Sequence, residues 1–85
     1  MDKFLDLKNG YKYRFIATNS VNQFFQFVTP TNETLDIPVF IIQSLGNKKD
    51  IPTKNLQIKY LRDKYKIGLP LAIRIYEFAL ERYPS

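Results

Sequence analysis

Apolar and polar residues alternate with a period of two in the first half of the chain. Residues 11–17 carry an aromatic or small apolar side chain at every second position, which is typical of a half-buried strand. The segments 24–28 and 34–37 continue the pattern, and turn-forming residues separate the three segments. The alternation therefore predicts a three-stranded antiparallel meander over residues 11–37.

The next segment, residues 38–46, begins with Pro38 and an apolar run and closes with Gly46. Proline is favoured at the first position of a helix and glycine just past its end, so this order favours a short helix. A continued strand is the alternative that the pattern leaves open.

Residues 53–83 carry the start and stop signals of two helices. Thr53 is suited to the N-cap of a helix that runs to about Lys66, and Gly68 interrupts it. Pro70 begins a second helix that continues to the end of this segment. Because strands come first and helices follow, we expect an α+β fold with a C-terminal αα-hairpin, and a length of 85 residues corresponds to a single domain.

The first helix of this hairpin has two distinct faces. On a helical wheel of residues 54–66, Ile58, Leu61 and Tyr65 form an apolar stripe that predicts the core-facing side. A basic stripe lies beside it and is directed to solvent or to a partner, with a merely solvated face as the alternative. The stripe consists of Lys59, Arg62 and Lys66 at spacing i, i+3, i+7. The predicted partner-binding residues are these three together with Lys48, Lys49 and Lys54.

The second helix of the hairpin is apolar over a wide arc, so most of its surface is expected to be covered. This surface could pack against other parts of the same chain or against a second copy of the protein. In the second case the protein would be a homodimer. We therefore treat three of its side chains as a possible apolar interface: Leu71, Ile75 and Phe78.

The segment 58–62, followed by Ile67, Gly68, Leu69 and Ala72, resembles the helix, glycine turn and helix in the C-terminal domain of the bacterial ribosomal stalk protein. The resemblance implies a tight αα-hairpin, and we infer no ribosomal role from it. Where that family has lysine in its second helix, this chain has Pro70, Leu71 and Ile73.

The chain carries a formal charge of +5, and residues 43–85 hold nine of its thirteen basic residues and four of its eight acidic residues. Such a surplus attracts an acidic protein, a nucleoprotein or nucleic acid. The abundance of Lys, Asn, Ile, Tyr and Phe also fits an AT-rich genome, whose codons would supply lysine without selection for binding. This composition suggests a low-GC bacterium or its phage as the source.

The chain contains neither histidine nor cysteine, which removes the usual proton shuttles, nucleophilic pairs and zinc ligands. We therefore expect no enzyme activity, no cofactor and no metal, and a location in the reducing cytoplasm without a membrane partner. The sequence favours a protein-binding adaptor or inhibitor, plausibly phage-encoded and acting on a host nucleic-acid-handling enzyme of the defence type. Direct binding of DNA or RNA with little sequence preference is the alternative, although Glu77 and Glu81 in the second helix argue against reading of the major groove.

Overall fold

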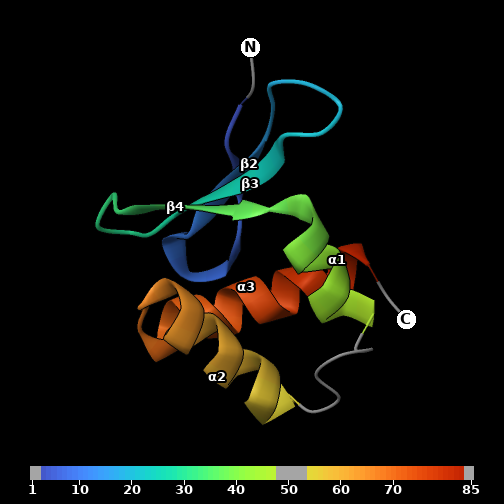
Figure 1. Ribbon diagram of the computed structural model, residues 1–85. Helices are drawn as coiled ribbons and strands as arrows, with labels where there is room; N and C mark the ends of the chain where they lie inside the picture. Colours follow the sequence, from blue (N-terminus) through green and yellow to red (C-terminus); the bar gives the residue numbers. More distant parts are fainter. Residues whose placement is uncertain (1–2, 48–53, 84–85) are drawn as a thin grey trace. The chain divides into compact units, whose positions relative to one another are not determined.

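The computed structural model describes residues 3–47 and 54–83 and has the expected α+β composition (Figure 1). The described residues divide into two compact units, Met1–Val39 and Phe40–Ser85. The first unit contains the strands β1 (Leu5–Asp6), β2 (Lys12–Ala17), β3 (Gln23–Val28) and β4 (Thr34–Pro38), with a 3-10 turn η1 (Lys8–Gly10). The second contains the helices α2 (Lys54–Tyr65) and α3 (Leu69–Arg82) and all of α1 (Val39–Asn47) except its first residue. Treatment of the whole chain as a single domain stays a prediction.

The sheet has four antiparallel strands in the order β1-β2-β3-β4, whereas the sequence predicted three. The strands β2, β3 and β4 form the predicted meander. The additional strand, β1, pairs Leu5 with Tyr13 and Asp6 with Lys12. It is only two residues long, too short for any alternation to reveal it, and its pairing with β2 defines it.

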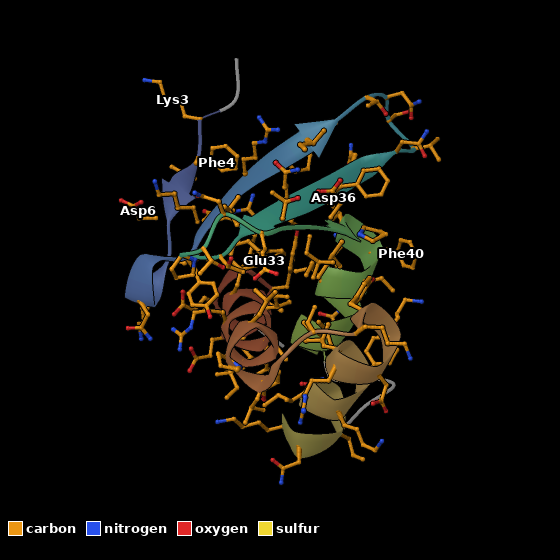
Figure 2. All side chains as sticks on the ribbon, turned by 90° about the vertical axis from the view of Figure 1, so that its left-hand side faces the viewer. Lys3, Phe4, Asp6, Glu33, Asp36 and Phe40 are labelled. Carbon is orange, nitrogen blue, oxygen red and sulfur yellow. The ribbon has the colours of Figure 1, made fainter. Side chains whose placement is uncertain are left out.

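The two faces of the sheet follow the predicted alternation. On one face, Phe25 lies between Phe15 and Ile37, and Phe25 and Ile37 are completely buried. On the opposite face, the Arg14 Nε donates a hydrogen bond of 2.8 Å to the Gln26 Oε1. The Arg14 guanidinium also lies 4.7 Å from the centre of the Phe4 ring. Phe4, labelled in Figure 2, comes directly before β1. Period-two patterning thus separates an apolar face from a mixed one.

In the second unit, residues 39–47 form the helix that the proline and glycine signals favoured, and the alternative of a continued strand is wrong. The role assigned to Gly46 also needs correction, because Gly46 lies inside α1 and is buried instead of ending the helix. A Cβ atom on Gly46 would lie only 2.8 Å from the Ala79 carbonyl oxygen and 2.7 Å from the Tyr83 Cβ. Gly46 is therefore the point at which α1 approaches the C-terminal end of α3.

The helices α2 and α3 form the predicted hairpin, and the core-facing stripe of α2 is largely confirmed. Ile58 and Leu61 are buried, and Tyr65 is half-buried. Gln57 is also buried, with 1% of its surface exposed, although its polar side chain gave no reason to expect this. Its Nε2 donates a hydrogen bond of 2.9 Å to the Leu45 carbonyl oxygen. This carbonyl belongs to the last turn of α1, where helix geometry leaves oxygens without a partner, so Gln57 ties α2 to α1.

Candidate partner-binding groove

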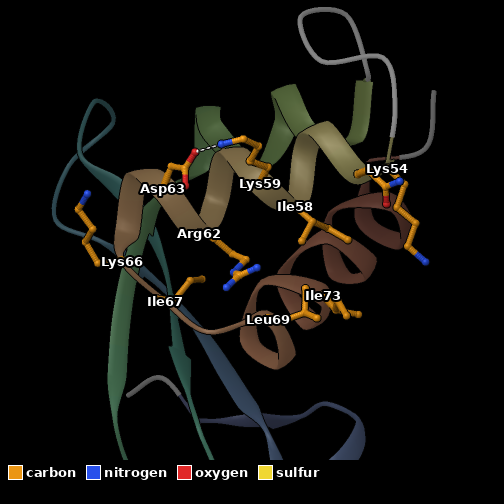
Figure 3. Close-up of a pocket in the computed structure, with 10 residues that line it drawn as sticks. Lys54, Ile58, Lys59, Arg62, Asp63, Lys66, Ile67, Leu69 and Ile73 are labelled. Carbon is orange, nitrogen blue, oxygen red and sulfur yellow. Dashed lines mark hydrogen bonds and ion pairs between the residues drawn. The ribbon is translucent and has the colours of Figure 1, made fainter.

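An open groove of about 680 Å3 lies along α2 and the first turns of α3 (Figure 3). Two of its lining residues, Lys54 and Arg62, lie two turns apart on α2, and Ile58 lies between them at one turn from each. This face of α2 therefore repeats in the order cation, aliphatic side chain, cation. The local helix alone places these three residues in line.

The groove gathers the described members of the predicted basic set. Lys54, Lys59, Arg62 and Lys66 all line it, together with one acidic residue, Asp63. The other two predicted residues, Lys48 and Lys49, lie outside the described residues. Four cations against one carboxylate leave a surplus of positive charge, which is the electrostatic character that the sequence predicted for this surface.

Lys59 and Asp63 form an ion pair within the groove, with 2.7 Å between the Lys59 Nζ and the Asp63 Oδ2. Both side chains are about two-thirds exposed, at 69% and 66%, so the pair contributes little to folding. The hydrogen bond from Lys59, followed by its charge, lowers the pKa of Asp63 below its ordinary value, and Lys66 and Arg62 add to this effect. Asp63 is therefore ionised at neutral pH.

The floor and the far wall of the groove are aliphatic, formed by Ile58, Ile67, Leu69 and Ile73. Ile58 is buried, Ile67 and Ile73 are half-buried, and Leu69 is 45% exposed. The sequence interpretation missed the last three as groove residues, because they come from the turn and from α3. One signal was present: Leu69 and Ile73 lie one turn apart, beside the positions that α3 buries.

The predicted apolar interface has a different environment. The structure buries Ile75 and Phe78, with 0% and 6% of their surfaces exposed, and leaves Leu71 half-buried. The exposed aliphatic surface of α3 is instead at its first residue, Leu69, which lines the groove. The case for a partner surface in the second unit consequently rests on the groove.

Lys66 adopts a left-handed backbone conformation, with φ of 56°, directly after the end of α2. The sequence had placed Lys66 as the last residue of this helix and on its basic stripe. Glycine is the usual residue at this position, because a side chain in the left-handed region meets steric resistance. The chain thus has a charged residue that lines the groove at a site where glycine would relieve backbone strain.

Replacing Lys66 with glycine is expected to raise the free energy of unfolding by about 0.5–1 kcal/mol, the relief of left-handed strain less the entropy that glycine adds to the unfolded chain. Urea denaturation followed by circular dichroism would measure the change. Lys64→Gly is the matched control: this residue is exposed within the last turn of α2, and its replacement should lower the free energy of unfolding by about 1 kcal/mol. Equal effects of the two substitutions would contradict the strain at Lys66.

Comparisons with known proteins leave the groove as the main guide to function. No protein-family model, curated protein or solved structure matches this chain. Within residues 3–47 and 54–83, no group of three or more acidic, histidine or cysteine side chains is placed to hold a metal ion. The αα-hairpin that the sequence predicted is present as α2 and α3.

Proposed function

We propose that the protein is a non-catalytic binding module, an adaptor or inhibitor, which docks an acidic segment of a protein partner in the α2–α3 groove. The observation that carries this proposal is the combination of a cationic rim with an aliphatic floor in a single groove. Carboxylates of a partner would meet Arg62 and Lys54, while its apolar side chains would cover Ile58 and Leu69. Electrostatic complementarity would speed association, and the apolar contact would supply much of the affinity.

Direct binding of nucleic acid is the second candidate, and the positive charge of the groove supports it. The composition of the lining favours a protein partner, however. The residues that line the groove include no aromatic side chain on which a base could stack. A duplex would contact the cations through phosphates and leave the aliphatic floor unused.

Within the part of the chain that the structure describes, no helix is long and apolar enough to span a bilayer.

The proposal is tested by capture of partners from source cells with the wild-type chain and with a variant in which Lys59, Arg62 and Lys66 are all alanine. Because these side chains are exposed, we expect each replacement to change stability by only about 0.5 kcal/mol. The captured partner should be a protein that survives nuclease treatment and is lost with the triple variant. Its contact segment, located by cross-linking to the groove, should contain Asp or Glu beside aliphatic residues.

A charge-matched control comes from the first unit, where Lys3, Lys8 and Lys12 are also exposed. Their replacement with alanine removes the same charge and should leave capture unchanged. Duplex nucleic acid would be favoured instead if nuclease abolishes capture. The slope of log affinity against log salt should then fall by about 0.9 for each basic residue of the groove that loses a phosphate contact. If the groove variant captures the partner as efficiently as the wild-type chain, the groove is only a solvated surface.

A further inference from the structure

The groove cations differ in whether an anion of the same chain already neutralises them. Lys59 is held by Asp63, which follows it by one helical turn. No carboxylate among residues 3–47 and 54–83 forms an ion pair with Arg62, which is exposed. Figure 3 shows the Arg62 side chain extending into the space between α2 and the start of α3, while Lys59 and Asp63 lean toward each other. The unneutralised charge at the middle of the groove is therefore that of Arg62.

We propose that Arg62 anchors a carboxylate of the partner segment. Asp63 acts as an internal competitor of that segment, because it already occupies the neighbouring cation, Lys59. This inference rests on the proposed function and assigns specificity within the same groove. A guanidinium holds a carboxylate through two parallel hydrogen bonds, which gives Arg62 an advantage in geometry over any lysine. Asp63 limits affinity in two ways: it neutralises Lys59, and its own charge repels an approaching carboxylate.

The spacing along α2 defines the ligand further. Lys54 and Arg62 are eight residues apart, which corresponds to about 12 Å along the helix axis. A segment that uses both cations thus carries two carboxylates about 12 Å apart, which is about four residues of extended chain. Aliphatic side chains between these carboxylates would face Ile58 and Leu69. The recognised chemistry is therefore an acidic residue, a short aliphatic stretch and a second acidic residue.

The test uses the full chain and a blocked synthetic peptide with two glutamates about 12 Å apart and leucines between them, with affinity measured by NMR titration. Arg62→Ala should weaken binding about tenfold, since it removes the anchor. Asp63→Asn should strengthen binding about threefold or more, because it frees Lys59 and removes a repulsive charge. Lys59→Ala should weaken binding about threefold, because it leaves the charge of Asp63 without its ion-pair partner.

A double variant makes the test decisive. In the Asp63→Asn protein, Lys59→Ala should abolish the gain in affinity, so the double variant, which lacks both charges of the pair, should bind the peptide like the wild type. Circular dichroism would confirm that every variant is folded, as expected for exposed positions. If Asp63→Asn leaves the affinity unchanged while Arg62→Ala weakens binding, the competitor role is overturned and the groove function stands. If Arg62→Ala has no effect, or a peptide with glutamine in place of glutamate binds equally well, the proposed function fails as well. Tighter binding of a DNA duplex with the same response to Arg62→Ala would also overturn it.

Discussion

Replacing Gly46 with alanine is expected to lower the free energy of unfolding by about 2–3 kcal/mol. The added methyl group would meet backbone and Cβ atoms of α3, with the Ala79 carbonyl oxygen 2.8 Å away and the Tyr83 Cβ 2.7 Å away. Backbone atoms cannot move aside as the end of a flexible side chain can, so α1 and α3 must separate. Gly46 is itself buried, which leaves no outward direction for the methyl group. Urea denaturation monitored by circular dichroism would measure the loss.

The matched control for this substitution is Gly68→Ala. A Cβ atom on Gly68 would lie 3.7 Å from the Pro70 Cδ, an ordinary contact, and φ of Gly68 is −77°. Alanine is a poorer N-cap than glycine but restricts the unfolded chain, and the two effects nearly cancel, so we expect a change within about 0.5 kcal/mol. A Gly46→Ala variant that is as stable as Gly68→Ala would show that the approach of α1 to α3 is not tight.

Replacing Gln57 with glutamate is expected to lower the free energy of unfolding by about 3 kcal/mol at neutral pH. The two side chains have nearly the same shape, but the carboxylate cannot donate the hydrogen bond that the Leu45 carbonyl oxygen accepts. An ionised group would also be buried, at a position where only 1% of the surface is exposed. Equilibrium denaturation across a range of pH would measure both effects.

The pH dependence of this variant has a definite sign. Burial raises the pKa of the introduced carboxyl group above the ordinary glutamate value of about 4.3, so the folded state retains a proton that the unfolded state releases. Stability is therefore highest below about pH 4.3, where the protonated group can donate to Leu45, and is lost as pH rises through the folded-state pKa. Gln57→Leu is the control, with a loss of about 1–2 kcal/mol that does not depend on pH. Parallel pH profiles for the two variants would contradict a buried carboxyl at this site.

The candidate groove shows how far local patterning extends. A helix places Lys59 and Arg62 beside the stripe of Ile58 and Leu61 whatever surrounds it, so their spacing was sufficient to predict a basic face there. The third predicted member, Lys66, follows the end of α2 and lines the groove from a left-handed backbone conformation. The aliphatic wall, by contrast, depends on where α3 begins and how it lies against α2, and Leu69 and Ile73 become groove residues only through that packing. The ion pair of Lys59 with Asp63 has i, i+4 spacing, which the sequence contains, but its place inside the groove follows from the same packing.

The sequence by itself determined the meander of residues 11–37, the α+β order and the two helices of the hairpin. These features depend on alternation and on proline and glycine signals, which act between neighbours in the chain. Tertiary structure alone decided the pairing of β1, the inward position of Gln57 and the role of Gly46. Gln57 is buried because a carbonyl of α1, twelve residues earlier, accepts its hydrogen bond. Gly46 is required because α3 approaches it from more than thirty residues further along the chain. No local pattern encodes such contacts, since the partner that makes each residue necessary is supplied by the packing of distant segments.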